Sequence, residues 1–140
     1  MTVYIDAAPG KGRGVFAAKD FKEGEIIEVC PVIIVPGGET KLMDDSIMSD
    51  YVFEWTEEPE TYAVVLGYGS IYNHSNEPNA EFDTDYENHT MVFSAIRDIK
   101  KGEEICTDYQ WELEGEEAPE WFRKLSESEQ NRNRKPHENQ

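Results

Sequence analysis

Short runs in which apolar and polar residues alternate cover much of the chain up to Tyr109. Alternation with a period of two, together with β-branched and aromatic residues, is typical of strands that bury one face. Gly, Pro, Asn and Asp separate the runs, as expected of turns. The pattern predicts strands over residues 3–6, 14–17, 26–35, 62–66, 81–85, 90–96 and 104–107.

Two other segments show helical spacing. Ile47, Tyr51 and Trp55 recur at four-residue steps, which predicts a helix over residues 44–55. A second helix is predicted over residues 116–125, where large apolar side chains share one side. We expect residues 1–125 to form one domain with this helical segment at its C-terminal end, and residues 126–140 to be a disordered polar tail.

The chain contains an internal repeat. Residues 19–27 (KDFKEGEII) match residues 97–105 (RDIKKGEEI) at most positions. Each copy predicts a strand, a turn opened by Asp in which Gly supplies a positive φ, and a second strand. Two such β-turn-β units favour an architecture of small sheets over one of alternating strands and helices.

Size and charge narrow the class of protein. A chain of 140 residues with 38% hydrophobic residues suits one domain with its own core. The net charge of −17 disfavours direct binding to nucleic acid and favours a basic partner. An acidic surface that simply keeps the protein soluble is the alternative explanation of this charge.

The sequence also indicates in which cellular compartment the protein is expected. The longest apolar stretch, residues 26–35, is too short to span a bilayer, and the first residues lack the features of a secretory signal. Cys30 and Cys106 have no Cys or His at metal spacing, so we expect reduced thiols in a reducing, intracellular compartment. Nucleus, cytoplasm and export into a host cell all stay open.

Candidate chemistry is concentrated in three strings: Lys11-Gly12-Arg13-Gly14-Val15-Phe16, Asn73-His74-Ser75-Asn76-Glu77-Pro78-Asn79 and Gly102-Glu103-Glu104-Ile105-Cys106-Thr107-Asp108-Tyr109. The first is not a P-loop, because no Gly-Lys-Ser/Thr follows at the required spacing. It is not a dinucleotide fingerprint either, because β-type residues follow where a helix should begin. His89 and His137 give His74 no zinc spacing, so we expect no metal site.

In this order, the three strings resemble those of the SET domain, a family of S-adenosylmethionine-dependent protein lysine methyltransferases. The resemblance covers about residues 3–109 and is strongest to small stand-alone members, such as the viral histone methyltransferases. It implies a mainly β fold, the SET-domain fold of several small β-sheets with a C-terminal pseudoknot and one or two short helices. By analogy with the small viral members, it also suggests a homodimer.

The resemblance assigns roles in binding S-adenosylmethionine. The glycine loop should pass beside the methionine portion of the cofactor, and Asn73 and His74 should bind its amino-acid and adenine parts. Ser75 and Asn79 should instead hold the loop. The zinc-binding cysteine cluster that closes many family members is absent, so we expect Trp111 to cover the adenine. The implied cofactor-binding residues are Lys11, Gly12, Arg13, Gly14, Tyr72, Asn73, His74 and Trp111.

Tyr109 is implied as the catalytic tyrosine, and Asp108 as a residue that orients its segment. Tyr51, Tyr68 and Thr107 are implied to line a channel for the substrate lysine, with Tyr72 as a further aromatic candidate. An apolar channel favours the neutral amine that the attack requires. A role in the core is an equal alternative for Tyr51. Many members have Phe or Tyr where this chain has Thr107, so a roomier pocket and di- or trimethylation are expected; the alternative is that Trp111 or Tyr68 fills the space.

The implied function is methyl transfer to lysine side chains of a protein, with a basic tail such as that of a histone as the substrate. One alternative is a catalytically idle domain that binds a basic peptide as an interaction module. Another is a β-rich ligand-binding domain without methyl transfer. The presence of Tyr109 and of Asn73-His74 favours the enzyme, because an idle copy often loses the tyrosine.

Overall fold

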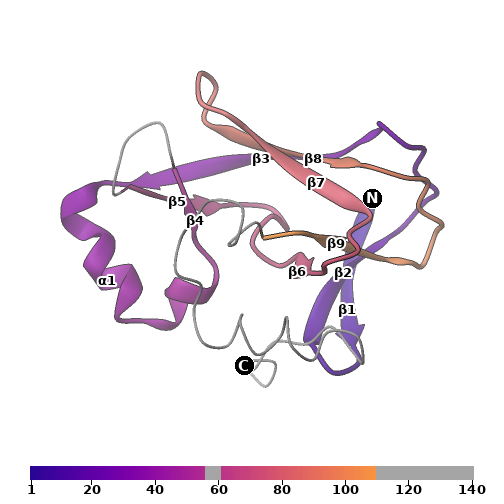
Figure 1. Cartoon of the computed structure of the whole chain (residues 1–140), viewed down its shortest axis with the longest axis horizontal. Coiled ribbons are helices and arrows are strands. Elements are labelled where there is room, and N and C mark those ends of the chain that lie inside the picture. Colours follow the sequence, from indigo (N-terminus) through magenta and orange to yellow (C-terminus); the bar gives the residue numbers. More distant parts are fainter. Residues whose placement is uncertain (56–60, 110–140) are drawn as a thin grey trace. The chain divides into compact units, whose positions relative to one another are not determined.

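The computed structural model describes residues 1–55 and 61–109 (Figure 1). The chain divides into two compact units. The first contains Met1–Ile27, Tyr72–Glu81 and the segment that begins at Ser94, and the second contains Glu28–Ile71 and Phe82–Phe93. The elements are β1 (Val3–Ala8), β2 (Gly12–Ala17), β3 (Ile26–Val35), the 3₁₀ helix η1 (Gly37–Glu39), α1 (Thr40–Asp44), the 3₁₀ helix η2 (Ile47–Asp50), β4 (Phe53–Glu54), β5 (Tyr62–Val65), β6 (Asn73–His74), β7 (Ala80–Asp85), β8 (Thr90–Ala95) and β9 (Glu104–Thr107).

The predicted fold class is confirmed, because the described residues are mostly β and form small sheets. Every predicted strand is present with ends that agree to within two residues. β4 and β6 were not predicted, since each has only two residues and no alternation can be read over so short a run. The helix predicted over residues 116–125 and the tail after it lie outside the described residues.

The helix predicted over residues 44–55 is wrong. The structure has the short helix α1 and then a separate turn, η2. Between them Ser46 is extended (φ −131°, ψ 173°), and its Oγ accepts the N–H of Met48 at 3.1 Å, which starts the new turn. The spacing does not mark one buried face, because Ile47 is 51% exposed, whereas Trp55 is 1% exposed and packs edge-on against Tyr86 at 4.9 Å between ring centroids.

The first unit is built on a four-stranded sheet of order β1-β2-β9-β6. β1 and β2 form an antiparallel hairpin, and Gly10 and Gly12, with φ of 78° and 77°, supply the left-handed backbone that its tight turn requires. β9 is antiparallel to β2, with Val15 opposite Ile105, and parallel to β6. The last described strand therefore lies between strands from the beginning and the middle of the chain.

The internal repeat forms a reciprocal contact within the first unit. Phe21 and Ile99, at equivalent positions of the two copies, exchange backbone hydrogen bonds of 2.8 and 2.9 Å, and both side chains are buried. The predicted turn glycines, Gly24 and Gly102, both have a positive φ, 87° and 90°. The two copies are thus related by an approximate two-fold symmetry.

This symmetry extends to a pair of aspartates, which gives a direct test. Asp20 Oδ1 accepts the backbone N–H of Lys101, and Asp98 Oδ1 accepts that of Glu23, both at 2.8 Å. Because the two bonds are equivalent, we expect Asp20→Ala and Asp98→Ala to lower the free energy of unfolding by similar amounts, about 1 kcal/mol each. Urea unfolding measures both, with Asp83→Ala as the control, since Asp83 accepts only from its neighbour in the described structure. A difference between the two variants of about 1 kcal/mol or more would contradict the symmetry.

The second unit is built around a sheet of order β4-β5-β3-β8-β7. β3 is central and pairs antiparallel with β5, with Val32 opposite Val65. The buried side chains include Trp55 and Phe93, and Phe53 packs edge-on against Phe82 at 5.2 Å. Within the described ranges, the helices are too short to cross a membrane.

Candidate functional site

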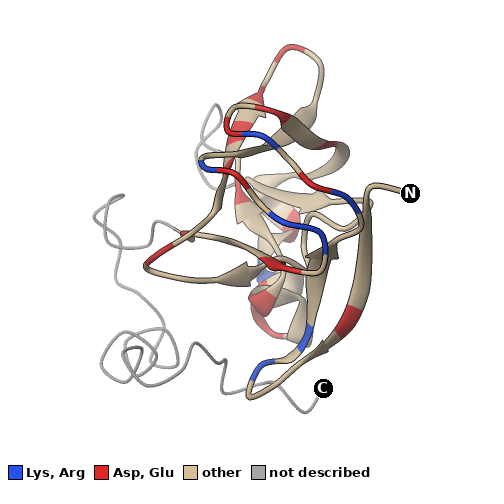
Figure 2. Cartoon of the chain, turned by 90° about the vertical axis from the view of Figure 1, so that its right-hand side faces the viewer, with Lys and Arg blue, Asp and Glu red and all other residues tan. Residues whose placement is uncertain are grey.

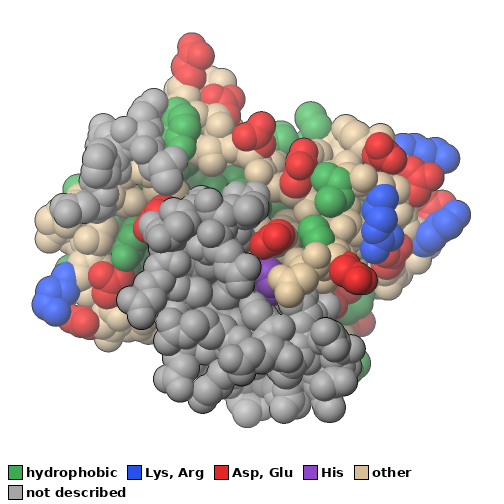
Figure 3. Space-filling model, viewed as in Figure 1, with side chains coloured by type: hydrophobic (Ala, Val, Ile, Leu, Met, Phe, Trp, Pro, Cys, Tyr) green, Lys and Arg blue, Asp and Glu red, His purple; other side chains and the backbone are tan. Residues whose placement is uncertain are grey.

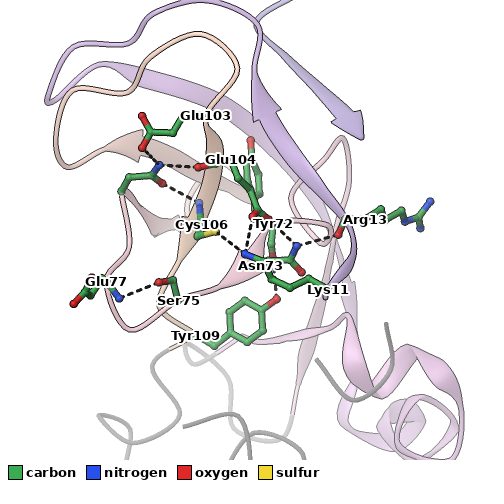
Figure 4. Close-up of polar contacts among 11 residues, drawn as sticks. Lys11, Arg13, Tyr72, Asn73, Ser75, Glu77, Glu103, Glu104, Cys106 and Tyr109 are labelled. Carbon is green, nitrogen blue, oxygen red and sulfur yellow. Dashed lines mark hydrogen bonds and ion pairs between the residues drawn. The ribbon is translucent and has the colours of Figure 1, made fainter. Parts of the chain in front are cut away.

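The three strings meet in the first unit, around β9 (Figure 4). The parallel pairing of β6 with β9 places Asn73 opposite Cys106 and His74 opposite Thr107. Strand β2, which carries the glycine loop, lies on the other side of β9. Residues as far apart as 95 positions in the sequence are therefore in contact.

Asn73 lies in a polar network at the centre of this cluster. Its side chain amide nitrogen donates to the carbonyl oxygen of Arg13 at 2.9 Å and to Oε2 of Glu104 at 2.8 Å. The other carboxylate oxygen of Glu104 forms an ion pair with Lys11 Nζ at 2.6 Å. Arg13 thus contributes through its backbone, while its side chain points away from the network in Figure 4.

Gly14 makes room for this network. It does not have a positive φ, so no turn demands glycine there. A Cβ at this position would lie 2.4 Å from Glu104 Oε2 and 2.9 Å from Asn73 Nδ2, closer than real contacts allow. The second glycine of the string is therefore required for the approach of Glu104 to Asn73.

His74 is an internal anchor. Its side chain is fully buried, Nδ1 accepts the backbone N–H of Tyr109 at 3.1 Å, and Nε2 lies 3.0 Å from Oδ1 of Asn76. Because Nδ1 accepts, the proton of a neutral ring must be on Nε2, where it can be donated to Asn76. Asp108 Oδ1 lies 3.8 Å from Nδ1. The ring therefore fixes the start of the segment that carries Tyr109.

Tyr109 is held at both ends. Its backbone is bound by His74, and its hydroxyl donates to the carbonyl oxygen of Tyr72 at 2.7 Å. The rings of Tyr109 and His74 lie 5.1 Å apart at an interplanar angle of 58°. Tyr72 is 2% exposed, whereas Tyr109 is half-buried. A hydroxyl that donates in this way acts toward other groups as an acceptor.

Residues 73–79 clamp β9 through backbone and side chain hydrogen bonds. The backbone N–H of Ser75 donates to Thr107 O at 2.9 Å, and Ser75 Oγ accepts the N–H of Glu77. The Asn79 amide donates to Glu104 O at 2.8 Å and accepts the N–H of Cys106 at 2.9 Å. These bonds lie in the region where the resemblance predicts the pseudoknot.

Thr107 has an unusual environment. Its side chain is 1% exposed, and its hydroxyl oxygen has no hydrogen-bond partner among the described residues. A buried hydroxyl without a partner costs free energy, so such groups often face a water or a ligand.

Cys106 lies beside the ion pair, with its sulfur 3.8 Å from Lys11 Nζ. Burial and the Glu104 carboxylate raise the pKa of the Cys106 thiol to about 12, although Lys11 opposes the shift. The thiol is therefore protonated at neutral pH and is a poor nucleophile. Burial likewise raises the pKa of Cys30 in the second unit.

The other predicted residues lie elsewhere in the chain. Tyr68 is half-buried in the second unit, where its backbone N–H donates to Glu28 Oε2 at 3.0 Å after a turn at Gly67 with φ 65°. Tyr51, also half-buried, ends η2 in the same unit. Trp111 lies outside the described residues. Within the described ranges, no cluster of His, Cys, Asp and Glu suited to a metal ion is found.

Glu104 is the residue of this cluster to which the sequence alone assigned no role. It lies inside the third string, but two adjacent glutamates look like a solvated surface pair. Its contact with Asn73 depends on the parallel pairing of β6 and β9, which short strands do not reveal. The lack of space for a side chain at Gly14 also indicates that Glu104 approaches Asn73, but this crowding can be seen only in the structure.

Comparison with known proteins gives a consistent set of relatives. The family described as SET domain matches residues 12–110. The chain is 31% identical over 122 residues to the H3 lysine-37-specific histone-lysine N-methyltransferase of Schizosaccharomyces pombe, covering 86% of this chain and 82% of that protein. It is also 32% identical over 122 residues to human histone-lysine N-methyltransferase 2D, of which the match spans 2%.

Solved structures agree in fold. A crystal structure of a proposed Plasmodium falciparum histone methyltransferase superposes with a TM-score of 0.61 at 31% identity, covering 77% of this chain and 92% of that one. A chain of the Polycomb Repressive Complex 2 of Chaetomium thermophilum, in an autoinhibited conformation bound to S-adenosylmethionine, gives a TM-score of 0.66 at 24% identity, over 92% of this chain and 17% of that one. The second likeness bears on the fold alone.

Proposed function

The chain belongs to the SET-domain family of S-adenosylmethionine-dependent protein-lysine methyltransferases, and from this premise we propose that it methylates lysines in the basic tail of a histone. Relatives named for histone lysines support this substrate. So does the net charge of −17, since a tail rich in Lys and Arg is attracted to an acidic surface. Acidic residues occur at many places along the chain (Figure 2), and acidic side chains are spread over the face in Figure 3. A histone substrate would place the activity in the nucleus.

The residues of the first unit fit the cofactor. S-adenosylmethionine has an α-ammonium and a carboxylate at one end and an adenine at the other. The Asn73 amide oxygen is an acceptor for the ammonium, and the backbone at Gly12 and Gly14 allows close approach. The His74 ring has partners on both nitrogens, so we assign His74 its contact with adenine through the backbone. The contact of Trp111 with adenine stays a prediction.

The bound cofactor would supply an electrophilic methyl group on a sulfonium. The task of the chain is then to align a neutral lysine amine with that methyl, because an in-line displacement needs positioning and charge placement more than covalent help. We propose that the Tyr109 hydroxyl, oriented by the Tyr72 carbonyl, acts as an acceptor beside the reacting atoms. Thr107 would line the channel that excludes water and favours the neutral amine, and the contribution of Tyr51 and Tyr68 to this channel stays a prediction.

The observation that carries the proposal is the assembly of Tyr109, His74 and Asn73 around β9 by direct hydrogen bonds. The experiment is transfer of labelled methyl from S-adenosylmethionine to core histones, intact or with their tails removed. We expect label on intact histones only. Label on both intact and tailless histones would show that a target lysine lies outside the tails. Absence of label, with cofactor bound in calorimetry, would exclude core histones as substrates.

Thr107 gives a prediction about the product. Because its side chain is smaller than the Phe or Tyr of many family members, we expect the wild type to form di- or trimethyl-lysine and Thr107→Phe to shift the product toward monomethyl-lysine. Mass spectrometry of the modified peptide measures both. Thr107→Val, which keeps the size and removes the hydroxyl, should keep the wild-type distribution. Monomethyl-lysine as the sole wild-type product would contradict the roomy pocket.

A further inference from the structure

We propose that Glu104 is a positioning residue that, paired with Lys11, fixes the orientation of the Asn73 amide so that its oxygen faces the α-ammonium of the cofactor. This inference rests on the proposed role of Asn73 in binding S-adenosylmethionine. It adds a role for Glu104 and changes that of Lys11. Figure 4 shows the residues concerned.

The two hydrogen-bond acceptors around Asn73 decide which way its amide points. The Arg13 carbonyl and the Glu104 carboxylate, at 2.9 and 2.8 Å, accept hydrogen bonds and cannot donate them. Both can be satisfied only if the nitrogen of the Asn73 amide faces them, and this uses both of its N–H groups. The amide oxygen must then face the other way. An ammonium group, which only donates, binds that oxygen and would be repelled by the reversed amide.

Lys11 secures the charge of Glu104. Their side chains are 12% and 17% exposed, and the two charged atoms are 2.6 Å apart. Removing one partner from such a pair leaves the other charge poorly compensated. Lys11 Nζ also lies within 3.8 Å of the Cys106 sulfur, so its contacts point into the protein. We therefore assign Lys11 to Glu104 and not to the cofactor.

Gly14 supports the same interpretation. Its missing side chain leaves the space through which Glu104 Oε2 reaches the Asn73 amide, since a Cβ would lie 2.4 Å from that oxygen. A methyl group at Gly14 should displace the carboxylate without changing any charge. The same Cβ would lie 2.9 Å from Asn73 Nδ2, so this substitution disturbs the hydrogen bond at both of its ends, whereas a change of Glu104 disturbs it at one.

The decisive variant is Glu104→Gln. A glutamine amide has one acceptor and one donor, so it places a donor against either Lys11 or the Asn73 nitrogen. Reversal of the Asn73 amide relieves the second conflict at the cost of its bond to the Arg13 carbonyl, and it turns N–H groups toward the cofactor ammonium. The probes are S-adenosylhomocysteine and its analogue that lacks only the α-amino group, with both dissociation constants measured by calorimetry.

We expect the wild type to bind the amino-bearing probe about 10- to 100-fold more tightly than the analogue, as for a hydrogen bond to a charged group. Glu104→Gln and Gly14→Ala should each lose most of this preference. Glu23→Gln, which makes the same charge change at an exposed side chain, should keep it. Thermal unfolding checks that each variant is folded.

A merely structural role for Glu104 predicts another result, in which both probes bind more weakly by the same factor and the preference is unchanged. That result would overturn the inference. If Glu104→Gln does not fold, Gly14→Ala decides in the same way. Failure of the wild type to bind S-adenosylhomocysteine would instead overturn the proposed cofactor site, so the two failures are distinguishable.

Discussion

Replacing Tyr109 with Phe is expected to lower the rate of methyl transfer by about 10²- to 10³-fold, the usual cost of removing one preorganised polar group from a reacting centre. The ring, and the backbone bond to His74, stay in place, because only the hydroxyl that donates to Tyr72 O is lost. Affinity for S-adenosylmethionine should therefore change little. Single-turnover transfer of labelled methyl measures the rate, and calorimetry measures the affinity.

Tyr4→Phe is the matched control for this variant. Tyr4 lies in β1 of the same unit, two strands from β9 in the sheet, and stacks on Phe16 with ring centroids 5.8 Å apart. Its rate should match that of the wild type. If the Tyr109→Phe enzyme transferred methyl at the wild-type rate, the Tyr109 hydroxyl would have no catalytic role. Loss of rate together with loss of cofactor affinity would indicate a role in binding.

Asn79→Ala is expected to be the most destabilising single change described for this chain. The Asn79 side chain is 3% exposed and satisfies two backbone groups of β9, the carbonyl of Glu104 and the N–H of Cys106. Truncation leaves both groups without this partner in a buried strand. We expect a loss of about 3–5 kcal/mol in the free energy of unfolding and a fall in Tm of about 10–20 °C.

Urea and thermal unfolding of Asn79→Ala and Asn88→Ala test this expectation. Asn88 is exposed and bonds locally to Asp85, so its loss should cost about 1 kcal/mol or less. If Asn79→Ala were no more destabilising than Asn88→Ala, the clamp on β9 would not hold the first unit together. Because Cys106 lies opposite Asn73 in the β6–β9 ladder, we also expect weaker cofactor binding by Asn79→Ala.

Much of the fold could be predicted from the sequence because strand alternation is a local signal. The bounds predicted for the long strand and for the last one are those of β3 and β9. The helix prediction failed for a physical reason, since the four-residue spacing joined the exposed Ile47 to the buried Trp55, which do not share one buried face. Ser46, which caps a new turn through its own hydroxyl, was a polar residue that could have argued against one continuous helix.

The candidate site was predictable where the residues stand next to each other in the sequence. Asn73 and His74 are adjacent in one string, and Tyr109 ends another, so the strings pointed to them directly. Contacts between residues from distant segments of the chain could not be predicted in this way. Glu104 lies 31 positions from Asn73 and meets it only through a two-residue parallel pair. Such a contact leaves no local pattern.

The reciprocal contact of the two repeat copies has a consequence for synthesis. One hydrogen bond joins Glu23 to Asp98, 75 residues later in the sequence, and another joins Asp20 to Lys101, 81 residues later. Closing a loop of that length costs about 4 kcal/mol in chain entropy, which the contacts formed afterwards must offset. The copies cannot meet on the ribosome until the later one has left the exit tunnel. The segment Glu28–Ile71, by contrast, emerges as one continuous piece. The nascent chain can therefore hold a methyl donor only near the end of translation of the described residues.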